Sequence, residues 1–128
     1  MAETAARPCA TGLIPLAHVA DVERSVEFYS QLGMDLRGHL KNAAGRLQWA
    51  HVGCEHADLM FSVASEAAGS TRHSVLFYLY SPDLVALRTH LLAHGVRVSG
   101  ITYPAYMPKG EIRVDDPDGY CLLIGQAG

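Results

Sequence analysis

Apolar residues recur along the first half of the chain at two spacings, one typical of strands and one typical of helices. The mostly apolar run 13–19 predicts a strand, which Pro15 confines to a sheet edge or to the start of the strand. Asp21 then predicts a helix N-cap, and apolar residues at helical spacing predict a helix over 22–32 that ends at Gly33. Short apolar segments between turn residues predict three more strands, at 35–41, 46–52 and 58–64.

The second half of the chain repeats this order of elements. The segment 74–80 predicts a strand, Asp83 predicts the N-cap of a second helix, and Gly95 predicts the end of that helix. Three further strands are predicted at 96–102, 111–114 and 120–124. The interval from Asp21 to Gly33 equals the interval from Asp83 to Gly95, which indicates an internal duplication.

The duplication predicts a single domain, residues 1–128, that is built from two βαβββ modules. The first module spans about 12–64, the second spans about 72–126, and the small polar segment 65–71 is predicted to link them. A chain of 128 residues of which 49% are apolar and 18% charged is expected to be globular, because disorder requires low hydrophobicity and high net charge.

Charge and cysteine content exclude several classes of function. Ten Lys and Arg residues against 13 Asp and Glu residues give a net charge of −3, unlike the basic surface that binds nucleic acid. No apolar run approaches the roughly 20 residues that span a bilayer, so no membrane partner is expected. Three cysteines without a Cys-x-x-Cys pair encode neither a disulfide framework nor a structural zinc site, which indicates a cytoplasmic location.

Two motifs resemble a known family. The segment Asp21–Tyr29 with Leu32-Gly33, and the hairpin Asp116-Pro117-Asp118-Gly119, resemble the first helix and the last hairpin of the vicinal oxygen chelate superfamily. This is the glyoxalase/bleomycin resistance protein/dioxygenase group, and the chain is most similar to its metal-free, bleomycin-resistance-like branch. The resemblance implies an α+β fold in which two βαβββ modules curl mixed sheets around a concave cavity, with the helices outside.

The same resemblance implies where a metal would bind. In metal-dependent members the ligands come from the first and last strands of each module, at positions that correspond here to Ile14, Leu76 and Leu123, with Phe61 added by superposing the repeats. All four side chains are apolar, so neither a catalytic metal nor a cofactor is expected. His90 and His94 lie one helical turn apart but flank an apolar stripe, which favours a solvated helix face over a metal site.

Strand alternation, anchored on the family pattern, predicts which side chains face the cavity. The predicted ligand-binding residues are mostly aromatic with a few polar groups, as in many small-molecule pockets: His18, Trp49, His51, Phe61, Tyr78, Glu111 and Arg113, with Tyr103 and Tyr106 on a loop over the mouth. Leu59, Val63, Cys121 and Leu123 are expected to complete the wall. Glu111 and Arg113 are expected to lie beside Trp49 and to orient a ligand.

Each of these residues also has a plainer interpretation. Trp49 is the only tryptophan and would often be a core residue in a strand, while His18 and His51 would often be half-exposed strand residues. Glu111 and Arg113 could form a solvated ion pair of little energetic weight.

The preferred function is that of a small-molecule binding protein that sequesters an aromatic or antibiotic-like ligand in a metal-free cavity. The alternative is an enzyme, a metal-independent glyoxalase-like lyase or isomerase acting on a small carbonyl compound with His51 or Glu111 as the general base. A third possibility is an interaction module with a vestigial cavity. A homodimer is expected in each case, because an open concave sheet needs a second half to complete it.

Overall fold

The computed structural model describes residue 8, residues 12–64 and residues 75–128, so the predicted linker 65–71 lies outside the described residues. The first module contains β1 (Leu16–Val19), α1 (Val22–Ser30), β2 (Asp35–Lys41), β3 (Leu47–Cys54) and β4 (Ala57–Val63). The second contains β5 (Phe77–Ser81), α2 (Leu84–Ala93), β6 (Glu111–Asp115) and β7 (Cys121–Gln126).

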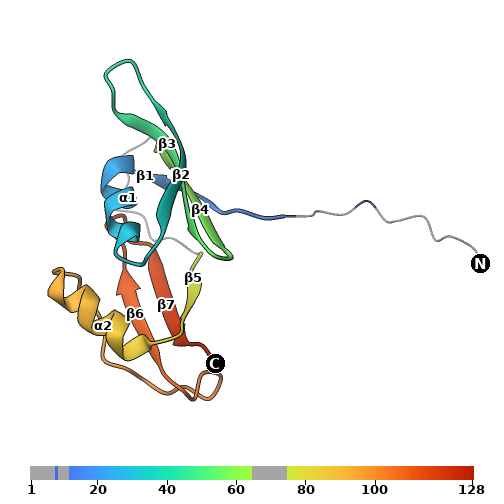
Figure 1. Ribbon diagram of the computed structural model, residues 1–128, viewed down its shortest axis with the longest axis vertical. Coiled ribbons are helices and arrows are strands. Elements are labelled where there is room, and N and C mark those ends of the chain that lie inside the picture. The colour runs from blue at the N-terminus through green and yellow to red at the C-terminus, as the bar shows by residue number, and fades with distance from the viewer. Residues whose placement is uncertain (1–7, 9–11, 65–74) are drawn as a thin grey trace, which may run out of the picture.

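The described strands form two mixed sheets, and neither sheet closes on itself. Sheet A has the order β1-β4-β3-β2 and sheet B has the order β5-β7-β6. In each sheet the first and last strands of the module pair in parallel, and the remaining pairs are antiparallel. Both helices lie on one side of the two sheets (Figure 1), so the α+β architecture predicted from the sequence is confirmed.

The two helices begin and end by the same devices. The side chain of Asp21 accepts a hydrogen bond from the backbone N–H of Arg24, and that of Asp83 accepts one from Ala86. Gly33 and Gly95 follow the helices with φ angles of 81° and 76°, a left-handed conformation that glycine adopts without steric cost. The repeated interval from cap to glycine therefore reflects two helices of nearly equal length.

The strand predicted over 96–102 is wrong as a regular strand. Within the described residues this segment forms only two isolated bridges to β6, from Val98 to Val114 and from Thr102 to Glu111. Between the bridges, the hydroxyl of Ser99 accepts the hydrogen bond of the Arg113 backbone N–H at 2.8 Å. A side chain thus takes the place of a ladder carbonyl, and the pairing is interrupted.

The hydrophobic core lies between the sheets and the helices. Its fully buried members come from alternate positions of strands in both sheets, with further contributions from both helices: Val19, Val22, Tyr29, Val52, Phe61, Leu84, Leu91, Ile112, Val114, Leu122 and Ile124. Because side chains alternate between the faces of a strand, burial of this set leaves the intervening residues on the helix-free side.

The Asp-Pro-Asp-Gly hairpin of the second module is bonded to the first module. Oδ1 of Asp118 accepts hydrogen bonds from the backbone N–H of Ala20 at 2.9 Å and from Arg24 at 3.2 Å, and Oδ2 accepts one from Ser25 at 3.4 Å. This buried carboxylate satisfies donors at the start of α1, so the hairpin is a structural joint between the modules as well as a turn.

Asp116 makes a second link across the same joint. Its Oδ2 accepts a hydrogen bond from the hydroxyl of Tyr29 at 2.8 Å, and its Oδ1 accepts the backbone N–H groups of Asp118 and Tyr120. Burial raises the pKa of Asp116 above its ordinary value, against the lowering effect of these hydrogen bonds. Burial, together with the Asp116 charge, also raises the pKa of Tyr29, so its hydroxyl stays a donor.

Candidate functional site on the open face

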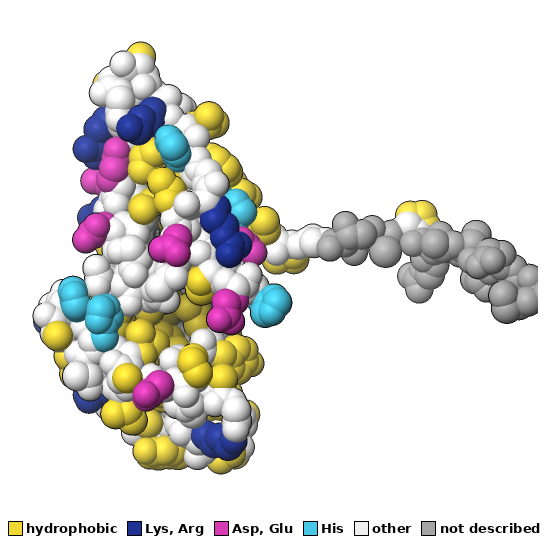
Figure 2. Space-filling model, viewed as in Figure 1, with side chains coloured by type: hydrophobic (Ala, Val, Ile, Leu, Met, Phe, Trp, Pro, Cys, Tyr) yellow, Lys and Arg dark blue, Asp and Glu magenta, His cyan; other side chains and the backbone are white. Residues whose placement is uncertain are grey.

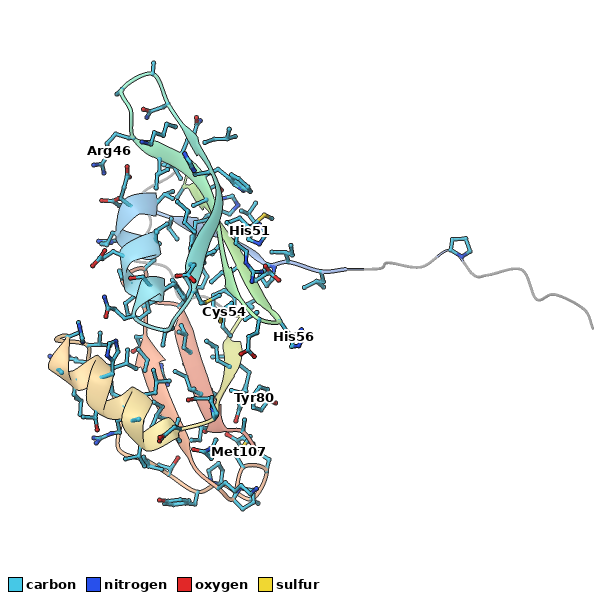
Figure 3. The ribbon with its side chains drawn as sticks, in the orientation of Figure 1. Arg46, His51, Cys54, His56, Tyr80 and Met107 are labelled. Carbon is cyan, nitrogen blue, oxygen red and sulfur yellow. The ribbon has the colours of Figure 1, made fainter. Side chains whose placement is uncertain are left out.

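The face of each sheet that carries no helix is called the open face. On sheet A, the strand registers place these side chains on it: Leu16 and His18 from β1, Trp49 and His51 from β3, and Met60 and Ser62 from β4. The ring of His18 lies within hydrogen-bond distance of the Ser62 hydroxyl, at 3.3 Å. Figure 3 shows His51 projecting from the side of the sheet away from α1. The predicted orientations of His18, Trp49 and His51 agree with this placement.

Phe61 does not lie on the open face, so its predicted place in the cavity wall is wrong. Its side chain is 0% exposed, and its ring centroid lies 5.1 Å from that of Tyr29 on α1. Leu59, also predicted to face the cavity, is buried on the same side.

The orientation of Phe61 was predicted wrongly because the two hairpins differ in length. His51 pairs with Met60 in the first module, whereas Arg113 pairs with Leu123 in the second, so the second hairpin is one residue longer. A shift of one residue moves every side chain to the other face of a strand. Met60, not Phe61, therefore corresponds to Leu123.

A cluster of three charged or titratable side chains lies at one end of the sheet A open face. Nε2 of His51 is 2.8 Å from Oδ1 of Asp58, and Nη1 of Arg37 is 2.6 Å from the same oxygen. The hydrogen bond from His51, followed by the hydrogen bond and charge of Arg37, lowers the pKa of Asp58 below its ordinary value. Arg37, His51 and Asp58 are called the His51 cluster.

Local backbone features position the His51 cluster. Asp58 pairs with Gly53, which places it diagonally across from His51 on the same face of the hairpin. The β2–β3 register shifts between Leu36 and Gly38, so Arg37 sits at a bulge, a feature that redirects side chains. A Cβ at Gly53 would lie 2.7 Å from Nη1 of Arg37 and from the carbonyl oxygen of Ala57, so glycine leaves room for the guanidinium.

Asp58 and Arg37 were not identified from the sequence. The hairpin register that pairs His51 with Met60 would have located Asp58 beside His51, whereas the sequence carries no comparable signal for the bulge at Arg37.

Trp49 is a half-buried residue of the open face and not a core residue. Its six-membered ring lies against Gly38, where an added Cβ would approach the ring to 3.4 Å. Its ring centroid lies 6.5 Å from that of His51. The indole and the imidazole are thus neighbours on one surface.

The open face of sheet B is built around a buried carboxylate. Glu111 is 6% exposed and accepts hydrogen bonds from the hydroxyls of Tyr78, at 2.6 Å, and Tyr106, at 2.9 Å. These hydrogen bonds are the largest cause of the raised pKa of both tyrosines, because a carboxylate favours the protonated phenol. Tyr106 thereby fastens the loop that precedes β6 to the sheet, while Tyr103 in the same loop is exposed.

The predicted pairing of Glu111 with Arg113 beside Trp49 is wrong. Glu111 accepts its hydrogen bonds from the two tyrosines. Arg113 forms an ion pair with Asp115 at 3.3 Å, and the two side chains are 60% and 59% exposed. Trp49 belongs to sheet A, whereas Glu111 and Arg113 belong to sheet B. Arg113 is therefore an exposed residue of sheet B that does not contact Trp49 in a shared polar group.

A groove of about 880 Å³ lies between the two modules and is lined by residues of both sheets, by Tyr29 of α1 and by Leu87 of α2. Its lining includes Asp58 of the His51 cluster and Tyr78 of sheet B, with Cys54 and His56 at the turn between β3 and β4. Figure 2 shows hydrophobic side chains gathered in the waist between the two lobes and along the edge away from the helices. The volume lies within the range of about 300–1,000 Å³ that is usual for small-molecule sites.

No group of three His, Cys, Asp or Glu side chains in residues 12–64 and 75–128 is arranged to hold a metal ion. His90 and His94 on α2 have ring centroids 4.2 Å apart. Nδ1–H of His94 donates to the carbonyl of His90, and Nε2 of His90 lies 3.2 Å from the side-chain oxygen of Gln31.

Neither helix in the described part of the chain is long and apolar enough to cross a membrane.

Solved structures of similar fold include binding proteins and an enzyme. TnmS3, an antibiotic binding protein from Streptomyces sp. CB03234, is 25% identical with a TM-score of 0.68, covering 94% of this chain and 100% of that chain. A bleomycin-binding protein complexed with bleomycin is 16% identical with a TM-score of 0.65, covering 93% and 100%. Lactoylglutathione lyase from Agrobacterium tumefaciens is 18% identical with a TM-score of 0.65, covering 92% and 95%.

The two structures below 25% identity establish the fold alone. No curated protein sequence matches this chain. A family model does match, and it covers residues 15–124, from the strand before α1 to the last strand. The chain therefore belongs to the Glyoxalase/Bleomycin resistance protein/Dioxygenase superfamily.

Proposed function

We propose that this protein binds a flat aromatic, antibiotic-like small molecule on its open face and sequesters it. The observation that carries the proposal is the concentration of aromatic and apolar side chains on the helix-free side of both sheets. Trp49 is half-buried there, and Tyr78 and Tyr80 remain exposed on sheet B, Tyr80 by 66%. Large apolar surface that a chain leaves in contact with water commonly marks a binding site.

Two of the similar structures are described as binding proteins, which supports a binding role. TnmS3 is described as an antibiotic binding protein, and a second structure of this fold holds bleomycin. The register positions at which the resemblance implies metal ligands carry Ile14, Met60, Leu76 and Leu123, whose side chains are poor ligands for hard divalent ions. A metal-free and cofactor-free site therefore stays our prediction, as does a cytoplasmic location.

A homodimer would complete the site. Among the described strands, β1 is at an edge of sheet A and β5 is at an edge of sheet B, and natural proteins usually cover such edges. A second copy placed against the open faces would also bury the exposed leucines and tyrosines around the groove. Light scattering that reports twice 13.8 kDa supports this arrangement, and a particle of 13.8 kDa at micromolar concentration contradicts it.

The enzyme hypothesis has one specific observation in its favour. A histidine that is hydrogen-bonded to a carboxylate, as His51 is to Asp58, is an arrangement that can orient a general base. A metal-independent lyase or isomerase that acts on a small carbonyl compound is therefore the second candidate.

One experiment separates these two candidates. Thermal unfolding is followed with a panel of polycyclic aromatic antibiotics and small keto acids, and each stabilising compound is then analysed for chemical change. A ligand at one hundred times its Kd raises the free energy of unfolding by about 2.7 kcal/mol. Saturable stabilisation by an aromatic compound that is recovered unchanged supports sequestration, whereas product formation supports the enzyme. Stabilisation by neither class contradicts both.

A further inference from the structure

The His51 cluster is a group of charged and titratable side chains on the open face of sheet A, beside Trp49. Its three side chains come from three strands: Arg37 from β2, His51 from β3 and Asp58 from β4. The bulge in β2 redirects the side chain of Arg37, and the absence of a side chain at Gly53 leaves room for its guanidinium.

The partners of His51 determine which ring nitrogen is left for a ligand. The Asp58 carboxylate is ionised near neutral pH, because its ordinary pKa is 3.8 and His51 and Arg37 lower it further. An ionised carboxylate only accepts hydrogen bonds, so Nε2 of His51 must carry the proton in the 2.8 Å contact. In the neutral imidazole, Nδ1 is then a hydrogen-bond acceptor.

The charges of the cluster limit what that acceptor recognises. Arg37 balances Asp58, so the cluster carries no net charge while the imidazole is neutral. An anionic carboxylate on a ligand would gain little from it, whereas a neutral hydroxyl could donate to Nδ1. An aryl hydroxyl fits best, because its O–H lies at the edge of a flat ring that Trp49 can stack, with the two protein rings 6.5 Å apart.

We propose that the His51 cluster selects hydroxylated aromatic ligands: the ligand ring stacks on Trp49 and its hydroxyl donates a hydrogen bond to Nδ1 of His51. This inference rests on the proposed function and names the substrate class of the same site. Asp58 and Arg37 are positioning residues, because they act on the ligand through His51.

The test compares two probes with the same aromatic ring, one with a hydroxyl donor and one in which a methyl group replaces the hydroxyl hydrogen. Binding of 2-naphthol and of 2-methoxynaphthalene to the full chain is measured by isothermal titration calorimetry. The wild type is expected to prefer 2-naphthol by about tenfold, the ratio that corresponds to one ordinary hydrogen bond. Equal binding of the two probes overturns the inference and leaves the proposed function standing. Binding of neither probe counts against the proposed function itself.

Variants show whether His51 is the acceptor. His51→Leu is expected to reduce the tenfold preference to less than about twofold, and Asp58→Asn, which no longer fixes the imidazole tautomer, to about threefold. The matched control is His39→Leu on β2, because His39 pairs with Ala50 and so lies on the helix side of the same sheet. The control is expected to keep the full preference. Full preference in His51→Leu, or its loss in His39→Leu, overturns the inference.

Discussion

Residues of the two modules can be matched by their register positions. The matched residues are chemically alike on the helix side of the sheets and chemically different on the open side. On the helix side, Ala50 of β3 corresponds to Ile112 of β6, and Phe61 of β4 corresponds to Ile124 of β7. All four are buried and apolar. The modules therefore share the pattern of their cores.

On the open side the corresponding pairs differ in chemistry. Trp49 corresponds to Glu111, and His51 corresponds to Arg113. One module presents an indole beside the His51 cluster, and the other presents a buried carboxylate that accepts hydrogen bonds from two tyrosines. Close packing constrains the helix side, whereas nothing in the fold itself fixes the open side. Specificity is therefore expected to reside in the residues by which the modules differ.

The largest expected effect separates Phe61 from Trp49. Phe61→Ala should lower the free energy of unfolding by about 3–5 kcal/mol, because it empties a fully buried site against Tyr29. Trp49→Ala should cost about 1 kcal/mol in stability but should weaken binding of an aromatic ligand strongly. Urea denaturation measures the free energy of unfolding, and isothermal titration calorimetry measures ligand binding. Equal stability losses would show that Trp49 is a core residue after all.

The next effect concerns the joint between the modules. Asp118→Ala removes the acceptor of the Ala20 backbone N–H, of Arg24 and of Ser25, and should lower the free energy of unfolding by about 2–3 kcal/mol. Asp115→Ala is the matched control, because that carboxylate is exposed and should cost less than about 0.5 kcal/mol. A small loss of stability in Asp118→Ala would mean that the hairpin forms a turn but does not hold the two modules together.

A pH experiment examines the His51 cluster alone. The folded-state pKa of Asp58 lies below its ordinary value of 3.8, so its ionised form stabilises the folded protein above that value. The stability difference between wild type and Asp58→Asn should therefore shrink as the pH falls through the lowered pKa of Asp58. Denaturation midpoints from about pH 5 downward, at roughly half-unit steps, measure it. A difference that grows as the pH falls below 3.8 would contradict the ionised state assigned to Asp58.

The smallest effect is expected at Arg113, the register counterpart of His51. Its ion pair with Asp115 is exposed, so Arg113→Ala should change the free energy of unfolding by less than about 0.5 kcal/mol and should leave aromatic ligand binding unchanged. A loss of binding comparable to that of His51→Leu would show that the two open faces contribute equally.

Most of the fold follows from local signals in the sequence. Asp21 and Gly33 mark α1, and Asp83 and Gly95 mark α2, because capping and left-handed glycine are effects of single residues. The segment 96–102 has the composition of a strand, but the Ser99 hydroxyl competes for the backbone of Arg113. Such competition is a tertiary effect that the sequence pattern does not reveal.

The site was less predictable than the fold. Alternation located Trp49 and His51 correctly, yet a single extra residue in the second hairpin reversed the orientation of Phe61. Arg37 depends on a β-bulge and on the space at Gly53, neither of which has a periodic signature. Errors in the site thus came from register, the property that short-range patterns specify least.

The central claim, that the open face is the ligand-binding surface, can be tested with one NMR titration. Trp49 is the only tryptophan, so its indole N–H gives a single assigned signal in a ¹H–¹⁵N spectrum. On addition of 2-naphthol, this signal and the backbone signals of His51 and Met60 should move together and saturate, while those of α2 stay in place. Saturable shifts confined to α2, with the Trp49 signal unmoved, would contradict the account.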